Sequence, residues 1–160
     1  MSLAWAQALP GQPAPLFQAL QEAMGAQIGH RLFTIMRHDS AAGRNSRIHS
    51  SHPQQYPVGG AKPLRPSAWT QQLLVEGRPF IGQDEAAIRA TFADHDTILA
   101  LGCESVLNLP VLWNGRVLGT VNLLHRAGHY VPHHARIGMA LAAWAAPALL
   151  DGACPPPASL

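Results

Sequence analysis

Four histidines form the group in this chain whose spacing most resembles a metal site. His125, His129 and His133 recur at intervals of four residues, and His134 follows directly. Zinc sites use His, Cys or carboxylate ligands at defined spacing. This interval would place imidazoles on one face of a helix, but a Gly and a Pro between them interrupt any helix there. We therefore favour a solvated loop and predict no metal site.

The two cysteines are too few for a disulfide scaffold. Cys103 lies in the body of the sequence and Cys154 lies in a Pro-rich tail. Thiols stay reduced in cytosolic proteins, so we predict that both are reduced and that the protein is cytoplasmic. For Cys103 we favour a small buried residue at the start of a strand, and a reactive nucleophile is the alternative.

Paired carboxylates are a further candidate for chemistry, because two of them can serve as general acid and base. Asp94 and Asp96 flank His95, and Asp84 precedes Glu85. Each pair begins a predicted helix, where negative side chains offset the macrodipole and accept from free N–H groups. We therefore interpret both pairs as helix caps and name no catalytic residue.

Composition limits the classes of function. Hydrophobic residues make up 48% of the chain and charged residues 12%, against roughly 25% charged in an average protein. The net charge of +2 is too small for the dense basic face that a nucleic-acid binder needs. The sequence lacks a signal-peptide pattern and an apolar stretch of roughly 18 residues. We therefore expect neither a nucleic-acid partner nor a membrane.

The hydrophobic pattern predicts elements in the order α-β-β-α-β-α-α-β-β-α. The predicted helices span 15–29, 67–77, 84–92, 94–101 and 131–150, and the predicted strands span 30–39, 44–51, 78–82, 105–113 and 116–125. Residues 52–66 are predicted to be a long loop without an element, of a kind that is often functional. We expect an N-terminal arm or short helix over 1–15 and a disordered Pro-rich tail over 151–160.

The dipeptide Asn114-Gly115 is the strongest turn signal, since both residues tolerate the positive φ of a tight hairpin turn. It joins the last two predicted strands. By alternation along the first of them, Asn108 faces one side of the sheet and its apolar neighbours face the other. Paired strands with helices before, between and after them indicate an α+β fold, with one antiparallel sheet and helices on both faces.

The segment Glu104 to His125, ESVLNLPVLWNGRVLGTVNLLH, resembles the carboxy-terminal hairpin of GAF domains. The positions typical of that hairpin are occupied by Ser105, Pro110, Gly115, Gly119 and Asn122. The upstream order of helices and strands is similar as well, so the resemblance identifies residues 16–150 as a GAF-like domain. It implies a sheet of five or six strands in the order 2-1-5-4-3, with terminal helices on one face and a small-molecule pocket on the other.

The resemblance also implies a homodimer formed through the first and last helices, and the apolar stripe Leu16, Leu20 and Met24 offers a surface for it. Members of the family bind cyclic nucleotides, bilins or haem, and one branch reduces free methionine sulfoxide. The signature of the cyclic-nucleotide binders is missing, because the only lysine is Lys62 in the predicted loop. No cysteine adjoins a histidine as in bilin binders, so we predict no cofactor.

Small-molecule pockets combine aromatic walls with a few polar anchors. Arg47 and His49 stand two apart on one predicted strand and should share a face. An arginine fork beside a histidine donor suits an anionic or carbonyl-bearing ligand, and the alternative is that both side chains are solvated on an edge strand. The predicted ligand-binding residues are Arg47, His49, Tyr56, Trp69, Phe80 and Asn108.

Three functions remain open. The favoured one is a non-catalytic sensory or regulatory module that binds a small molecule. The second is an enzyme resembling the free methionine-(R)-sulfoxide reductases, with Cys103 as the nucleophile, although that branch uses a cluster of three cysteines. The third is a dimerisation or partner-binding domain whose pocket holds no ligand.

Overall fold

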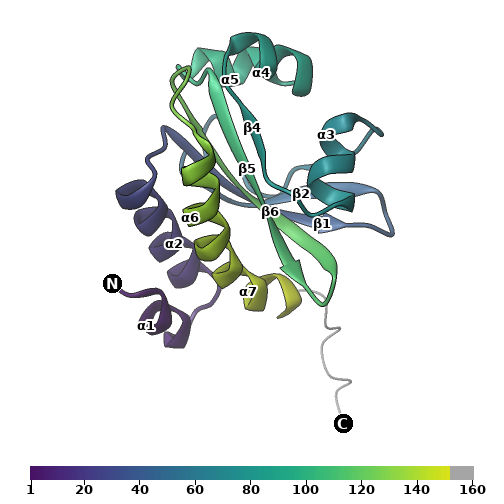
Figure 1. Cartoon of the computed structure of the whole chain (residues 1–160). Coiled ribbons are helices and arrows are strands. Elements are labelled where there is room, and N and C mark those ends of the chain that lie inside the picture. Colours follow the sequence, from purple (N-terminus) through teal and green to yellow (C-terminus); the bar gives the residue numbers. More distant parts are fainter. Residues whose placement is uncertain (152–160) are drawn as a thin grey trace.

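The computed structural model describes residues 1–151, which form one antiparallel sheet with helices on both faces (Figure 1). In chain order the strands are β1 (Leu32–Asp39), β2 (Arg44–Ser50), β3 (Ala61–Pro63), β4 (Phe80–Gly82), β5 (Ser105–Trp113) and β6 (Arg116–His125). Their order across the sheet is β3-β2-β1-β6-β5-β4. The predicted α+β class is therefore confirmed. The strand order differs in detail from the prediction, because β3 is an additional edge strand.

Strand β3 lies inside residues 52–66, so the prediction that this loop has no element is wrong. Ala61–Pro63 pair antiparallel with the first residues of β2. Two backbone hydrogen bonds continue the pairing, from Gly59 N to Arg47 O at 2.9 Å and from Arg47 N to Gly60 O at 3.1 Å. A short strand that ends in proline is tolerated at a sheet edge, where the missing donor breaks no ladder. The segment thus returns along β2 and lies beside the sheet.

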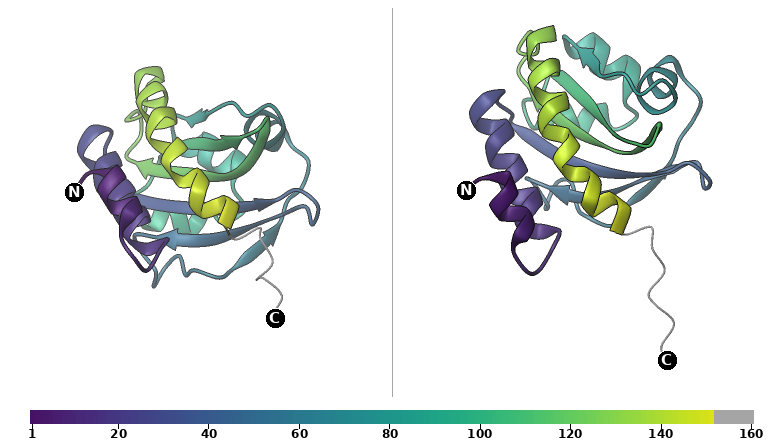
Figure 2. Two further views of the ribbon diagram at one scale, coloured as in Figure 1. Left: turned by 90° about the horizontal axis from the view of Figure 1, so that it is seen from below. Right: turned by 60° about the horizontal axis from the view of Figure 1, so that its bottom comes forward.

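The helical segments, in chain order, are α1 (Leu3–Ala8), α2 (Ala14–Gln27), α3 (Ala68–Thr70), the π-helix η1 (Gln71–Val75), α4 (Glu85–Thr91), α5 (His95–Ala100), α6 (Pro132–Ala142), the 3-10 helix η2 (Ala143–Ala145) and α7 (Ala146–Asp151). The predicted helix 67–77 is thus α3 continued as a π-helix, and the predicted helix 131–150 is divided at η2. Helices α2, α6 and α7 cover one face of the sheet, and α3, α4 and α5 lie on the other (Figures 1 and 2). In the described part of the chain, no helix is long and apolar enough to cross a bilayer.

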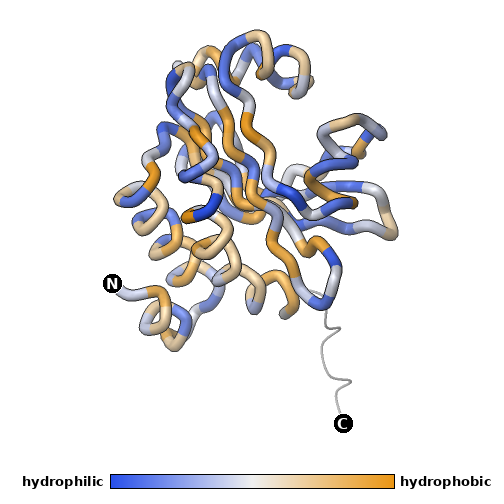
Figure 3. The backbone as a smooth tube through the Cα atoms, viewed as in Figure 1, coloured by the Kyte–Doolittle hydropathy of each residue, from blue (hydrophilic) through white to orange (hydrophobic). Residues whose placement is uncertain are grey.

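The sheet face under α2 and α6 carries the larger hydrophobic core, and Figure 3 shows the apolar residues along its central strands. Phe33 on β1 and Leu109 on β5 are fully buried there. The stripe of α2 formed by Leu16, Leu20 and Met24 is also at most 2% exposed. Because the protomer itself covers this stripe, the prediction that it offers a dimer surface is wrong.

The hairpin between β5 and β6 forms as predicted. Asn114 and Gly115 adopt φ values of 49° and 71°, the positive values that a tight hairpin turn requires. Further along β6, a Cβ atom on Gly119 would overlap the carbonyl oxygen of Met36 and lie 3.1 Å from the Leu149 Cδ1 of α7. Gly119 therefore lets β1, β6 and α7 approach closely.

Candidate ligand-binding site

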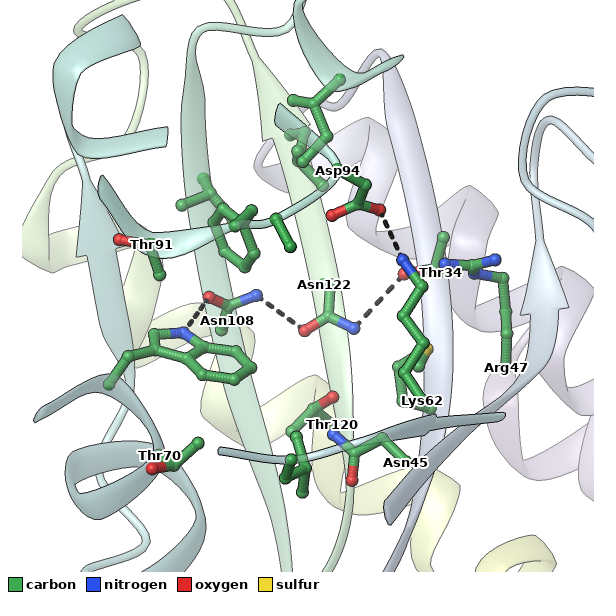
Figure 4. A pocket seen from close by; sticks show the side chains of 18 of the residues that line it. Thr34, Asn45, Arg47, Lys62, Thr70, Thr91, Asp94, Asn108, Thr120 and Asn122 are labelled. Atoms are coloured by element: carbon green, nitrogen blue, oxygen red, sulfur yellow. Dashed lines mark hydrogen bonds and ion pairs between the residues drawn. The ribbon is translucent and has the colours of Figure 1, made fainter. Parts of the chain in front are cut away.

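A cavity of about 500 Å³ lies between the second face of the sheet and the segments that contain β3, α3, α4 and α5 (Figure 4). Ligand pockets commonly measure roughly 300–1,000 Å³, so the cavity has the size of a small-molecule site. Its apolar walls come from β1, β5, β6, α5 and the segment after α4: Leu32, Met36, Val106, Leu124, Ile98 and Phe92.

A chain of side-chain hydrogen bonds runs across three strands along the floor of the cavity (Figure 4). The register sets Asn122 of β6 opposite Thr34 of β1 and opposite Asn108 of β5. Asn108 Nδ2 donates to Asn122 Oδ1 at 2.7 Å, and Asn122 Nδ2 donates to Thr34 Oγ1 at 3.3 Å. The three residues are at most 8% exposed. Each amide nitrogen has a second N–H, so this buried row can also donate into the cavity.

Trp69 of α3 joins this row from the side. Its Nε1 donates to Asn108 Oδ1 at 3.0 Å, and its ring meets Phe92 edge to face with centroids 5.5 Å apart. Ser67 holds the start of α3 in place, because its hydroxyl accepts from the Thr70 N–H at 3.1 Å while Thr70 Oγ1 accepts from the Ser67 N–H. Trp69 is thereby fixed as an aromatic wall with its polar edge satisfied.

Arg47 lies on β2 at the side of the cavity. Its guanidinium carbon is 4.5 Å from the centroid of the Tyr56 ring, and its Nη1 donates to the Pro57 carbonyl at 3.2 Å. Its Nε is buried without a hydrogen-bond partner among residues 1–151. Burial lowers the pKa of Arg47, and nearby Tyr56 and Asp94 oppose this effect. The guanidinium is thus held in place by the Tyr56 ring against its face and by the hydrogen bond from Nη1.

Asp94 connects the β2–β3 segment to the start of α5. Its Oδ2 accepts from Tyr56 Oη at 2.9 Å and from Lys62 Nζ at 3.0 Å. Burial alone would raise the pKa of Asp94, but the hydrogen bonds and charge of Lys62 and Tyr56 reverse this, so the pKa lies below its usual value. The interpretation of Asp94 as a side-chain cap is wrong, because its carboxylate makes no capping hydrogen bond. Asp84 does cap α4 by accepting from the Ala87 N–H.

His49 lies away from the cavity, so the prediction that it shares a face with Arg47 is wrong. The register pairs Ile35 with His49 but Met36 with Arg47, so Ile48 is the extra residue of a β-bulge. A bulge breaks the alternation of side chains along a strand. His49 therefore points to the helical face, where its Nε2 lies 2.8 Å from Gln21 Oε1 of α2, and burial lowers its pKa.

The other predicted residues divide between the cavity and its surroundings. Arg47, Tyr56, Trp69 and Asn108 line the cavity, whereas Phe80 packs into the adjacent cluster with Val106 and Leu124. The structure adds lining residues that sequence reasoning did not select: Thr34, Asn45, Lys62, Asp94, Thr120 and Asn122. Polar residues that alternate with apolar ones inside buried strands are the signal that would have found most of them.

Cys103 stands just before β5 and is fully buried in the cluster next to the cavity. Burial raises the pKa of its thiol to about 11, which leaves almost no thiolate at neutral pH. This environment fits the favoured interpretation of a small buried residue. Cys154 and the predicted tail from 152 onward lie outside the described residues.

The histidines at the end of β6 form a stack rather than a chelating group. The rings of His125 and His129 are parallel with centroids 3.8 Å apart, and the His134 ring is 5.5 Å from that of His129. His129 Nε2 lies 2.8 Å from the Ile28 carbonyl oxygen at the end of α2. Among residues 1–151, no group of three or more His, Cys, Asp or Glu is placed to hold a metal ion.

Comparison with known proteins gives one family and one fold. A family model described as "GAF domain" matches residues 16–149. The structure is similar to that of a GAF domain/HD domain protein from Geobacter sulfurreducens, with a TM-score of 0.70, 11% identity and coverage of 94% of this chain and 97% of that chain. The GAF domain of a two-component sensor histidine kinase from Bacillus halodurans gives a TM-score of 0.69, 10% identity and coverage of 86% and 92%.

A third similar structure is the GAF domain of a phosphoenolpyruvate-protein phosphotransferase from Coxiella burnetii, with a TM-score of 0.64, 16% identity and coverage of 94% of this chain and 92% of that chain. At these identities the likeness shows the fold alone. No curated protein matches the sequence.

Proposed function

Because the chain belongs to the GAF domain family, whose members are ligand-binding sensory and regulatory modules, we propose that it binds a small molecule in the cavity without transforming it. The observation that carries this proposal is the row Thr34–Asn122–Asn108, a set of buried hydrogen-bonding groups that faces an open volume of about 500 Å³. Buried polar groups are costly unless they are paired, and the unused N–H groups of this row suit a ligand that accepts hydrogen bonds.

Native mass spectrometry of the protein purified without added ligand tests this proposal. We expect a small-molecule adduct on the wild type that is lost in Thr120→Phe. Thr120 lines the cavity and is 2% exposed, so a phenylalanine ring at this position would fill the cavity. The adduct should persist in Thr97→Phe, which changes an exposed threonine of α5. Thermal unfolding would establish that both variants are folded. The absence of any adduct, or an adduct that survives Thr120→Phe, would contradict the proposal.

The reductase alternative predicts a different result. Cys103 has a buried thiol with a raised pKa, and it does not line the cavity. Both features support binding over catalysis. Turnover of free methionine sulfoxide that disappears in Cys103→Ser would instead establish the enzyme.

We also propose that two copies associate through the helical layer and that the protein acts in the cytoplasm. The support for association is apolar exposure on that layer, with Trp5 of α1 64% exposed and Ala140, Ala143 and Pro147 exposed along α6 to α7. Light scattering should show a dimer that is weakened by Ala143→Glu, whereas a monomer at micromolar concentration would contradict the proposal. The support for the cytoplasm is the free thiol of Cys103.

A further inference from the structure

The unused edge of the Arg47 guanidinium points to the class of ligand. An arginine can present two coplanar N–H groups to a carboxylate, one from Nε and one from the neighbouring Nη2. Within the described chain, the guanidinium makes its hydrogen bond through Nη1 alone, to the Pro57 carbonyl, and Nε has no partner. The Tyr56 ring covers one face of the group at 4.5 Å. The edge formed by Nε and Nη2 is therefore unpaired, and Nε, which the protein covers, must become uncovered when a ligand binds this edge.

The charge balance of the cavity favours an anion. Three cationic side chains line it, those of Arg47, Lys62 and Arg65, against the single carboxylate of Asp94. That carboxylate already accepts from Lys62 and Tyr56 on one oxygen, so its charge is largely matched by the lysine. Among the described residues, neither Arg47 nor Arg65 has a carboxylate partner. Arg65 is exposed, whereas Arg47 is partly buried, and this burial makes an incoming negative charge favourable at Arg47.

The other walls of the cavity indicate what the uncharged part of that anion should be. Trp69 and Phe92 form an aromatic corner with ring centroids 5.5 Å apart, and aliphatic side chains such as Ile98 and Leu124 complete the walls. The floor supplies uncharged amide donors from Asn108 and Asn122. A ring-shaped apolar body with a small polar substituent would satisfy both surfaces.

From these features we infer that the ligand is an aromatic carboxylic acid whose carboxylate binds the Nε–Nη2 edge of Arg47 and whose ring lies over the Asn108–Asn122 row. This inference rests on the proposed function, since it assigns a ligand class to the same cavity. A carboxylate is preferred to a phosphate, because the two N–H groups of a single guanidinium edge match the two oxygens of a carboxylate and leave a third phosphate oxygen without a donor.

The test uses three acids with their matched primary amides: benzoate with benzamide, 4-hydroxybenzoate with 4-hydroxybenzamide, and indole-3-acetate with indole-3-acetamide. Isothermal titration calorimetry should show that at least one acid binds roughly 10- to 100-fold more tightly than its amide, the range expected when charge-assisted hydrogen bonds are lost. Phenyl phosphate, measured in parallel, should bind more weakly than that acid.

Variants locate the effect. Arg47→Lys keeps the charge but removes the pair of coplanar N–H donors. It should therefore weaken binding of the acid by at least about tenfold and leave binding of the amide unchanged. Arg37→Lys is the matched control, because Arg37 lies on the neighbouring strand β1 and its Nε is also buried without a partner among residues 1–151. Its Nη2 donates to the Ala148 carbonyl on the helical face, outside the cavity, so acid binding should be unchanged.

Several outcomes would overturn the inference. Equal affinity for acids and amides, acid binding that survives Arg47→Lys, or tighter binding of phenyl phosphate would each exclude the carboxylate assignment while leaving a small-molecule site. Failure of every probe to bind would also overturn it. In that case the native mass spectrum decides the fate of the proposed function, since an adduct would preserve it and the lack of one would remove both. The acid–amide comparison needs no variant, so it holds even if Arg47→Lys does not fold.

Discussion

The amide row on the cavity floor can be tested by replacing its members singly and together. Asn122→Leu keeps the side-chain size but removes its polar atoms, so Asn108 Nδ2 loses an acceptor at 2.7 Å and Thr34 Oγ1 loses a donor at 3.3 Å. An unsatisfied buried group costs about 1–3 kcal/mol, and Asn108 is only 2% exposed. We expect a loss of about 2 kcal/mol in the free energy of unfolding, or roughly 4–8 °C in thermal midpoint.

The second single variant, Asn108→Leu, should cost about the same or somewhat more, roughly 2–3 kcal/mol. It leaves Asn122 Oδ1 without its donor and also removes the acceptor of the Trp69 indole, which lies 3.0 Å away. In the double variant neither residue of the Asn108–Asn122 pair keeps a polar side chain, so the loss of their hydrogen bond leaves no unpaired group at either position. Replacing both members of a hydrogen-bonded pair costs less than orphaning one. The double variant should therefore cost at least about 1 kcal/mol less than the two singles combined.

Urea denaturation followed by far-UV circular dichroism measures all three variants, and tryptophan fluorescence reports on the lost contact of Trp69. Thr97→Val on the exposed face of α5 is the control, and it should be neutral within about 0.5 kcal/mol. If the two single effects add to within about 0.3–0.5 kcal/mol of the double effect, the amides are not coupled. The row would then not act as one polar surface.

Three further predictions concern packing, pH and reactivity. Gly119→Ala should cost about 2–4 kcal/mol of unfolding free energy, because its methyl group would overlap a carbonyl oxygen of β1. Gly60→Ala, with open space around it, should cost under about 0.5 kcal/mol by the same urea titration. Burial and then the neighbouring His129 lower the pKa of His125 to about 4, so the unfolded chain binds this proton first. Stability should therefore fall as the pH drops from about 6.5 to 4, and thermal melts should show a shallower fall in His125→Gln; an equal slope would contradict this. Cys103, with its pKa near 11, should resist iodoacetamide until urea unfolds the protein, and peptide mass spectrometry that finds rapid labelling of Cys103 in the native protein would contradict its burial.

The sheet and its central hairpin could be predicted because their signals are local. Asn114-Gly115 specifies a turn through two positive φ values. The alternation around Asn108 sets its side of the sheet relative to its apolar neighbours, and in the structure Asn108 lines the cavity while Leu107 and Leu109 enter the opposite core. Both features depend on residues a few positions apart, which is the range over which sequence patterns determine backbone geometry.

The parts of the site that were missed depend on distant residues or on a single insertion. Asp94 is at a helix start and its type is a good cap, but its partners lie 38 residues away at Tyr56 and 32 residues away at Lys62. The bulge at Ile48 has no local signal, because isoleucine is a residue that regular strands favour. One extra residue then moved His49 to the other face, so Arg47 lines the cavity without it.

The bulge also links the cavity to the helical layer within one strand. On β2, Arg47 lines the cavity, while His49, two residues later, lies 2.8 Å from Gln21 of α2 and packs its ring against Phe17 and Phe33. A ligand that binds the Arg47 edge would act on a strand that the helices hold directly, without an intervening loop. If the ligand binds more tightly when β2 is in one position than in another, ligand binding will favour that position. The packing of α2 against His49 would then change as well, because the ligand contact and the helix contact share this strand. Under the proposed function, the helical layer is therefore the surface at which occupancy of the cavity would be detected.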